Sequence, residues 1–235
     1  MSAVNTPKSP VVDVVVVARN QAPSVAITLS AVPRKQVRSV IVVDNGSTDS
    51  TAAVARDAGA VVLREAKVGR GRACLRAIAH LETLPMPPDV VVLMAGDGSD
   101  DPRDLPSLVE PIRRDNAELV IGIRHNVRSR LPYARMVKRL LSTVYRVRLD
   151  DVGPYRAIRF PALVALALTD RGGGLDVEML VKAIKLGLHV AEVPVRSPAR
   201  TGRSRLRALN GKALTRSLDA TGRALFHIVR HSTTR

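Results

Sequence analysis

Residues 90–102 read VVVLMAGDGSDDP, and this stretch decides the fold class. Its five successive apolar residues, Val90–Met94, suit a strand that is buried on both faces. The turn that follows contains two glycines, and Asp100, Asp101 and Pro102 are typical of the start of a helix. A buried strand that ends in a polar turn and continues into a helix is the building unit of α/β proteins.

The same unit recurs along most of the chain. Further short β-branched runs that suit buried strands are Val11–Val17, Ser39–Val43, Val61–Leu63, Leu119–Ile123 and His189–Val195. Helical patterns occupy Ser24–Ala31, Ser50–Ala58, Gly71–Leu84, Asp104–Arg114, Pro132–Val147 and Val177–Leu186. Between the last two, residues 150–156 read as a turn. We therefore expect an α/β fold, with a mostly parallel, Rossmann-like sheet flanked by helices in a single domain.

The composition restricts the classes of function. The chain has 235 residues, 46% of them hydrophobic, and is large enough to bury one core. Its formal net charge of +16 favours polyanionic partners, namely nucleic acids, anionic membranes or phosphorylated small molecules. Aromatic residues make up only 2% of the chain and tryptophan is absent, so platforms for base stacking are scarce. We expect no nucleic-acid partner.

Two features bear on the compartment. Cys74 is the only cysteine, which excludes an intramolecular disulfide and fits a reducing environment. The apolar run Val11–Ala18 is too short to span a membrane and contains Asp13, so we expect neither a signal peptide nor a membrane anchor. The prediction is a cytoplasmic protein, either dissolved or peripheral on an anionic membrane that attracts its basic C-terminal segment.

Polar residues follow three of the predicted strands. Asn20 follows the first strand, Asp44–Ser47 follow the second, and Gly96 and Asp97 follow the strand at Val90–Met94. Ligands of open α/β sheets bind at the carboxyl ends of the strands, so these residues are candidates for a binding site. Asp97 is a candidate ligand for a divalent cation, and the alternative is a turn residue between two glycines.

Five segments of the chain resemble family-2 glycosyltransferases, and the resemblance is closest to the dolichyl-phosphate mannose synthase-like, polyprenyl-phosphate branch. They are VDNGSTDST at 43–51, GDGSDDP at 96–102, DVGPYRAI at 151–158, VEM at 177–179 with AEVPV at 191–195, and RTGRSR at 200–205. The resemblance covers most of the chain. It implies a GT-A fold and an inverting transfer of a sugar from a nucleoside diphosphate.

The resemblance also implies roles for individual residues. Asp44 would read the base edge, and Asp97 would bind the metal and the diphosphate. Arg156 would face phosphate, and Arg200, Arg203, Ser204 and Arg205 would form a loop that grips phosphate, although these loop residues could instead form a solvated basic surface. The remaining donor-binding candidates are Ala18, Asn20, Gln21, Asn45, Gly46, Ser47, Gly71 and Gly96.

A hydroxyl or amine acceptor would need a general base. Glu178 is the first candidate, with Asp150, Asp151 and Asp176 as alternatives. For all four, capping or ion pairing is the competing interpretation.

The chain departs from the family pattern at three positions. Ala95 replaces the first acid of Asp-x-Asp, and Asn45 replaces a second aspartate. Gln21 replaces a glutamate after the first strand, where Arg19 also adds a positive charge. We expect a weakened site for Mg²⁺ or Mn²⁺ at Asp97. One hypothesis is that arginines, Arg19 and Arg70 included, offset phosphate charge in place of part of the metal dependence.

The predicted organisation has three parts. Residues 1–10 form a disordered N-terminus, and residues 11–198 form the GT-A domain, with a nucleotide-sugar half at 11–124 and an acceptor half at 125–198. Residues 199–235 form the basic phosphate-binding loop and a C-terminal amphipathic helix. A homodimer is one assembly compatible with the sequence.

Three functions remain open at this stage. The first is transfer of a sugar to a polyprenyl phosphate or a similar phosphorylated acceptor, for which the phosphate itself is the nucleophile and no general base is needed. The second keeps the donor and uses a soluble metabolite or natural-product acceptor. The third is a catalytically silent nucleotide-binding protein that keeps the fold.

Overall fold

The computed structural model describes residues 9–124, 132–198 and 211–232. The strands are β1 (Val12–Ala18), β2 (Ser39–Asp44), β3 (Val61–Arg64), β4 (Val90–Ala95), β5 (Leu119–Arg124), β6 (Arg156–Arg159) and β7 (Val190–Val195). The α-helices are α1 (Ala22–Ser30), α2 (Thr51–Asp57), α3 (Arg70–Glu82), α4 (Leu105–Arg113), α5 (Pro132–Tyr145), α6 (Phe160–Ala165), α7 (Leu175–Lys185) and α8 (Gly211–Ser232), and short 3₁₀ turns occupy η1 (Arg34–Gln36) and η2 (Pro102–Asp104).

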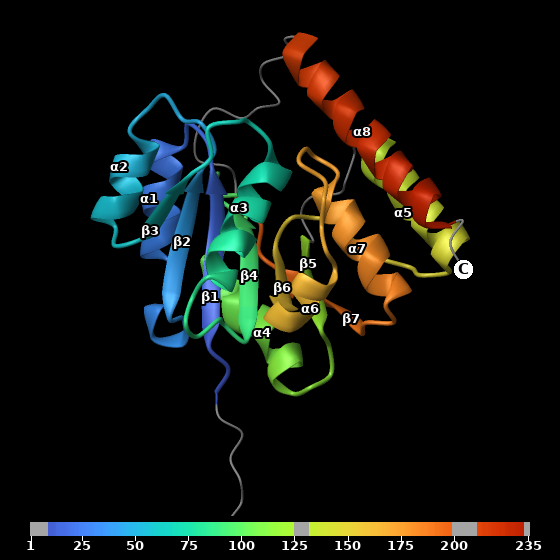
Figure 1. Cartoon of the computed structure of the whole chain (residues 1–235), viewed down its shortest axis with the longest axis horizontal. Coiled ribbons are helices and arrows are strands. Elements are labelled where there is room, and N and C mark those ends of the chain that lie inside the picture. The colour runs from blue at the N-terminus through green and yellow to red at the C-terminus, as the bar shows by residue number, and fades with distance from the viewer. Residues whose placement is uncertain (1–8, 125–131, 199–210, 233–235) are drawn as a thin grey trace, which may run out of the picture.

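The seven strands form one sheet in the order β3-β2-β1-β4-β6-β5-β7 (Figure 1). All pairs are parallel except those made by β6, which runs antiparallel to β4 and β5. The predicted mostly parallel sheet is confirmed. Strand β6 was not predicted, because its sequence RAIR is short and was read as the end of a turn. Since β6 lies between β4 and β5, the sheet interleaves the two predicted halves of the domain.

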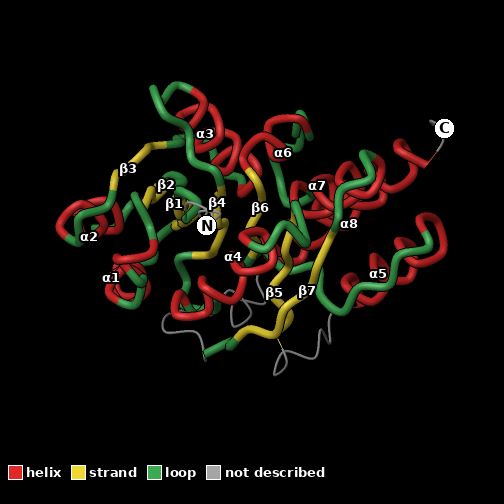
Figure 2. The backbone as a smooth tube through the Cα atoms, turned by 90° about the horizontal axis from the view of Figure 1, so that it is seen from below, coloured by secondary structure: helices red, strands yellow, loops and turns green. Residues whose placement is uncertain are grey.

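Each face of the sheet is covered by its own set of helices. Alternate residues of β1 show this: Val15 packs in a cluster with α3, α5, α6, α7 and α8, whereas Val14 and Val16 pack in a cluster with α1, α2 and α4. Figure 2 shows α3, α6 and α7 on one side of the strands and α1 and α4 on the other. Strands β1, β2 and β4 have continuous apolar runs because both of their faces are buried, whereas the edge strands β3 and β7 are partly exposed.

Helix α8 packs along α5 and α7 at the side of the molecule remote from β3 (Figure 1). Ala224 and Ile228 are buried against the core, and the Tyr145 hydroxyl donates to the carbonyl oxygen of Ile228 at 3.0 Å. Phe226 and Val229 on the same helix are 54% and 61% exposed. Within the described ranges, no helix is long and apolar enough to cross a bilayer.

Candidate active site

The carboxyl ends of β1, β2 and β4 lie side by side, as the sequence predicts. Parallel pairing sets Ala18 opposite Asp44 and Val17 opposite Ala95. Gly96 continues from β4, and its N–H donates to the Val17 carbonyl at 2.9 Å. A Cβ at Gly96 would lie 3.0 Å from the Cβ of Ala18, so a glycine allows the loop to lie this close to β1. The three strand ends form one polar edge, which we call the donor edge.

Hydrogen bonds join the loop after β1 to the loop after β2. The Asn20 N–H donates to Ser47 Oγ at 3.0 Å, and the Gln21 N–H donates to Thr51 Oγ1 at 2.8 Å. Asp44 is 4% exposed, and its Oδ1 accepts from the Ser47 N–H at 3.0 Å. The predicted donor-binding residues Asn20, Gln21, Asp44 and Ser47 are therefore brought together, and their contact with a base stays a prediction.

Asn45 and Gly46 shape the loop after β2. Asn45 Oδ1 accepts from the Gly69 N–H at 2.8 Å, and its Nδ2 donates to the Lys67 carbonyl at 2.9 Å. Gly46 has a φ of +71°, and a Cβ there would lie 3.0 Å from the Ala66 carbonyl oxygen. The side chain of Asn45 is thus occupied in holding the segment that leads into α3, which is a role the family resemblance did not assign.

Asp97 occupies the turn after β4 and is partly buried. Its Oδ1 accepts from the N–H of Ser99 at 3.1 Å and from the Ser99 hydroxyl at 2.6 Å. The turn role considered from the sequence is therefore present. Within the described part of the chain, no group of three or more His, Cys, Asp or Glu side chains is arranged to hold a metal. A cation at Asp97 would depend on few protein ligands and on oxygen atoms of the donor.

Asp100 follows Asp97 in the same loop and is 1% exposed. Its Oδ2 accepts from the Ala95 N–H at 2.9 Å, and its Oδ1 is buried without a hydrogen-bond partner in the described structure. Burial raises the pKa of Asp100 to about 6, against the opposing effects of the Ala95 N–H and of Arg124. Sequence reasoning assigned Asp100 to helix capping only. The sequence does contain a signal for Asp100. It is an acid only five residues after Ala95, the position at which the family usually carries the first acid of Asp-x-Asp.

Two partly buried ion pairs lie beside the donor edge. Arg70 Nε donates to Asp176 Oδ2 at 2.9 Å, and Arg124 Nε donates to Asp151 Oδ2 at 2.9 Å. Arg70 is therefore already paired, which weakens the hypothesis that it offsets phosphate charge. Arg19 differs, because its Nε is buried and has no hydrogen-bond partner among the described residues. Nothing in the sequence singled out Arg124, since its partner is 27 residues away in the chain.

The prediction that Arg156 faces phosphate is wrong in this structure. Its side chain is fully buried, and its three nitrogen atoms donate to the carbonyl oxygens of Gly153, Asp176 and Val152 at 2.8, 2.6 and 3.1 Å. Burial lowers the pKa of Arg156, and the nearby charge of Asp176 opposes this effect. These three hydrogen bonds fix the backbone before β6 and at the start of α7.

Glu178 also takes a structural role instead of the predicted role of general base. It is fully buried, and it accepts from the Thr169 N–H at 3.0 Å, from the Asp170 N–H at 2.7 Å and from Lys182 Nζ at 2.9 Å. Although burial alone would raise its pKa, these hydrogen bonds lower it. The carboxylate holds the loop before α7 and pairs with Lys182, so of the two alternatives weighed from the sequence, capping or ion pairing, ion pairing is the one observed.

Gly71 does not present its amide to a ligand, which corrects its assignment to donor binding. Its N–H donates to the Gly172 carbonyl at 2.8 Å, and the next N–H, that of Arg72, donates to the Arg171 carbonyl at 3.2 Å. A Cβ at Gly71 would lie 2.1 Å from the Asp170 carbonyl oxygen. Glycine is needed here because two backbone segments touch.

Some predicted site residues cannot be compared with the structure. Arg200, Arg203, Ser204 and Arg205 lie outside the described residues. The predicted disordered N-terminus, residues 1–10, is also outside them except for its last two residues.

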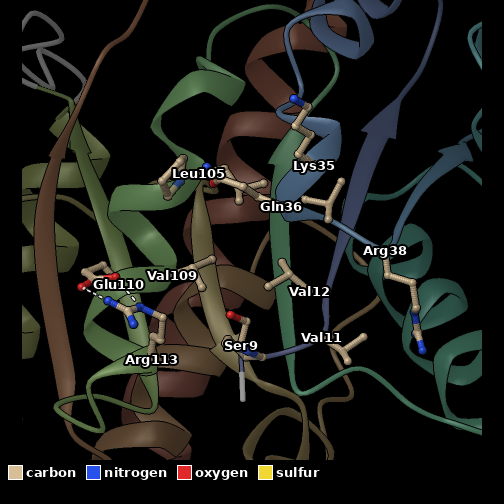
Figure 3. Close-up of a pocket in the computed structure, with 13 residues that line it drawn as sticks. Ser9, Val11, Val12, Lys35, Gln36, Arg38, Leu105, Val109, Glu110 and Arg113 are labelled. Carbon is tan, nitrogen blue, oxygen red and sulfur yellow. Dashed lines mark hydrogen bonds and ion pairs between the residues drawn. The ribbon is translucent and has the colours of Figure 1, made fainter. Parts of the chain in front are cut away.

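A cavity of about 550 Å³ lies at the opposite, amino end of the strands (Figure 3). It is lined by the start of β1, by residues around η1 and by α4, where Val12 and Leu105 contribute apolar side chains. Its acid, Glu110, is paired with Arg113 at 2.7 Å. Because ligands of such sheets bind at the carboxyl ends of the strands, the donor edge and not this cavity is the candidate active site.

Comparison with known proteins bears on the family of this chain. The family model described as "Glycosyl transferase family 2" matches residues 13–163. An uncharacterised glycosyltransferase of Mycobacterium tuberculosis is 36% identical over 197 residues, which cover 81% of this chain and 87% of that protein. An undecaprenyl-phosphate mannosyltransferase of Micrococcus luteus is 34% identical over 203 residues, covering 75% and 79% of the two chains.

The fold has a similar counterpart among solved structures. The glucosyl-3-phosphoglycerate synthase of Mycobacterium tuberculosis, in complex with Mn²⁺, uridine diphosphate and phosphoglyceric acid, superposes with a TM-score of 0.78. The superposition covers 96% of this chain and 80% of that one, at 21% sequence identity. At this identity the likeness concerns the fold, and it confirms the predicted GT-A type.

Proposed function

Because this chain belongs to glycosyl transferase family 2, we propose that it transfers a sugar from a nucleoside diphosphate sugar to a polyprenyl phosphate or a similar phosphorylated acceptor. The enzyme class, a glycosyltransferase, follows from the family. The proposal adds the acceptor class and an inverting displacement at the anomeric carbon. The undecaprenyl-phosphate mannosyltransferase among the relatives supports this acceptor class.

The donor edge supplies groups suited to a nucleoside diphosphate sugar. Asp44 can accept a hydrogen bond from a ring N–H of the base. Asp97 would hold Mg²⁺ or Mn²⁺, and such a cation would neutralise the charge of the departing diphosphate. Arg19 directly follows β1, and its buried Nε has no protein partner in the described residues. In the proposed complex, it would donate to a phosphate oxygen.

The main support for a phosphate acceptor is that carboxylates in the acceptor half are already engaged in ion pairs and hydrogen bonds. Asp151 and Asp176 are paired with arginines, and Glu178 holds a loop. An alcohol or amine acceptor would need one of them to remove a proton. A phosphate acceptor is already ionised near neutral pH, because its second pKa is about 6, and it can attack without a general base. Three of the four carboxylates considered as general bases are thus committed, and the exposed Asp150 is the fourth. This distribution favours a phosphate nucleophile.

The surface of α8 supports a role at a membrane. Phe226 and Val229 are exposed on this helix next to the exposed arginines Arg223 and Arg230, and the Arg230 guanidinium lies 5.6 Å from the centre of the Phe226 ring. Exposed apolar side chains among basic ones suit the interface of an anionic bilayer. We propose that the protein reaches a lipid acceptor as a peripheral protein at the cytoplasmic surface.

The decisive experiment incubates the purified protein with a panel of nucleoside diphosphate sugars and with either undecaprenyl phosphate in micelles or phosphoglyceric acid. Products are measured by mass spectrometry. We expect transfer to the lipid phosphate and its loss in Asp97→Ala, with Asp115→Asn, an exposed acid outside the site, as the matched control. Transfer only to the soluble acceptor would support the second function considered from the sequence. Donor binding without transfer to either would support a catalytically silent protein.

A further inference from the structure

A buried histidine of α8 holds the loop that precedes α7. His227 Nε2 is hydrogen-bonded to Asp170 Oδ2 at 2.9 Å, and both side chains are buried. The other ring nitrogen, Nδ1, is buried without a hydrogen-bond partner among the described residues, so the bond to Asp170 is the one that fixes the ring. Asp170 Oδ1 accepts in turn from the Gly172 N–H at 2.6 Å. His227 therefore holds the turn at Asp170 and Gly172 from the side of α8.

Glycines in this loop allow it to lie directly on α8. A Cβ at Gly172 would lie 2.7 Å from Nε of Arg223. A Cβ at Gly174 would lie 2.8 Å from the Cβ of Arg223 and 2.7 Å from Asp170 Oδ2. Because a larger residue at Gly174 would push the loop away from the helix, the position of the loop depends on that of α8.

On its other side the same loop touches the start of α3. The Gly71 N–H donates to the Gly172 carbonyl at 2.8 Å, and the Arg72 N–H donates to the Arg171 carbonyl at 3.2 Å. A Cβ at Gly69 would lie 2.3 Å from the Arg171 carbonyl oxygen. Backbone meets backbone here, so no flexible side chain lies between the two segments to absorb a shift of the loop.

The segment that leads into α3 is bonded to the donor edge. The Gly69 N–H donates to Asn45 Oδ1 at 2.8 Å, and Asn45 directly follows Asp44 at the end of β2. The Asn45 N–H donates to the Ala18 carbonyl at 2.9 Å, which is the last residue of β1. A continuous series of contacts therefore leads from α8, through the loop and the start of α3, to the ends of β1 and β2.

Packed segments and hydrogen bonds of this kind can carry energetic coupling between distant groups. We propose that His227 is a positioning residue for the donor edge, because its bond to Asp170 keeps the loop against the start of α3 and thereby fixes Asn45. The inference rests on the proposed function for its ligand, a nucleoside diphosphate sugar. Since α8 also carries the side chains proposed to contact a membrane, the same contacts join that surface to the donor edge.

Hydrogen exchange of the whole protein tests these contacts without a donor or an acceptor. His227→Phe keeps an aromatic ring and removes the hydrogen bond to Asp170. We expect the amides of Gly69, Gly71 and Arg72 to exchange about tenfold faster or more, while the amides of β1 keep their wild-type rates. A uniform loss of stability would instead accelerate exchange in β1 as well.

Two further variants make the exchange measurement specific. His231→Phe is the matched control, because His231 stacks on His227 from the next turn of α8, with ring centres 6.1 Å apart. It should leave exchange at the start of α3 unchanged. His227→Gln should restore slow exchange, because its side-chain amide can donate to Asp170 in place of the imidazole.

Calorimetric titration measures the effect on the donor edge. The probes are uridine, guanosine, thymidine and adenosine diphosphate, and the variants are compared with the nucleotide that the wild-type protein binds. We expect His227→Phe to weaken its binding about threefold or more. His227→Gln and His231→Phe should bind it as the wild type does.

A measurement on the wild-type protein covers the case in which His227→Phe does not fold. Coupling is reciprocal, so the nucleotide should shift the ring signals of His227 in nuclear magnetic resonance spectra. The signals of His189, exposed at the amino end of β7, should stay in place.

Three results would overturn the inference. They are unchanged exchange at the start of α3 in His227→Phe, an equal effect of His231→Phe, and an unshifted His227 ring in the nucleotide complex. Absence of sugar transfer, or of nucleotide binding by the wild-type protein, would instead contradict the proposed function. The exchange measurement would then still decide whether His227 positions the start of α3.

Discussion

Asp100 makes the stability of the metal-free protein depend on pH. Burial raises its pKa from about 3.8 to about 6, so the folded state binds a proton more tightly than the unfolded state does. The stabilisation from this group is complete below pH 4 and is lost as the pH rises to about 6. One pKa unit corresponds to about 1.4 kcal/mol, so the effect is roughly 3 kcal/mol. With chelator present, Asp100→Asn should remove this slope, as measured by urea unfolding between pH 4 and 7.

A parallel slope in wild type and Asp100→Asn would contradict this interpretation of the buried carboxyl group. The exposed acid Asp115 supplies the control, because Asp115→Asn should leave the slope unchanged.

Arg156 should matter for stability and not for phosphate binding. Replacing it with methionine would leave three buried carbonyl oxygens, at Val152, Gly153 and Asp176, without their donors. We expect a loss of roughly 3–5 kcal/mol in the free energy of unfolding. Arg113→Met, at an exposed ion pair, should leave the stability nearly unchanged. If Arg156→Met kept its stability and only raised the KM for the donor, the result would contradict this structural role and support the prediction that Arg156 contacts phosphate.

At the scale of elements, the start of α3 is locked to the loop before α7. Gly71→Ala places a Cβ that would meet the Asp170 carbonyl oxygen at 2.1 Å, so the two segments must separate. We expect a loss of about 2–3 kcal/mol, measured by chemical denaturation. Gly222→Ala is the matched control, since no atom lies within 4 Å of the added Cβ in α8. There the better helix propensity of alanine should give a gain of up to about 1 kcal/mol. Equal effects of the two changes would argue against the lock.

The elements also show where sequence reasoning succeeds. Short apolar and β-branched runs such as Val90–Met94 predicted six of the seven strands to within about two residues. Strand β6 was missed because only four residues form it, and one of them is Arg156. The buried arginine donates to carbonyl groups that lie in the preceding turn or 20 residues away in the chain, so no local pattern marks it as part of a strand.

At the scale of the whole molecule, the net charge of +16 and the exposed side chains of α8 predict binding to anionic vesicles. We expect flotation with phosphatidylglycerol vesicles and none with phosphatidylcholine vesicles at low salt. Binding should fall steeply towards 1 M salt, where the screening length is about 3 Å. The double change Phe226→Ala and Val229→Ala should weaken binding about tenfold, since each buried apolar side chain contributes on the order of 1 kcal/mol or more.

Met86 provides the control for this measurement. It is 75% exposed in the connection between α3 and β4, away from α8, and Met86→Ala should leave vesicle binding unchanged. Equal loss in Met86→Ala, or flotation with both kinds of vesicle, would argue against α8 as the contact surface.

The sequence by itself determined the α/β class, the parallel strands and the gathering of Asn20, Asp44 and Asp97 at one edge, because burial of both sheet faces and the direction of parallel strands are local properties of pattern and order. The tertiary structure alone decided which polar side chains remain for a ligand. Arg156 and Glu178 match the family motif, but both are engaged in hydrogen bonds to backbone groups. Asp100 was assigned from the sequence only to helix capping, yet it has a buried oxygen without a partner in the described structure. Hydrogen bonds between residues distant in the chain set that outcome, and a linear pattern does not record them.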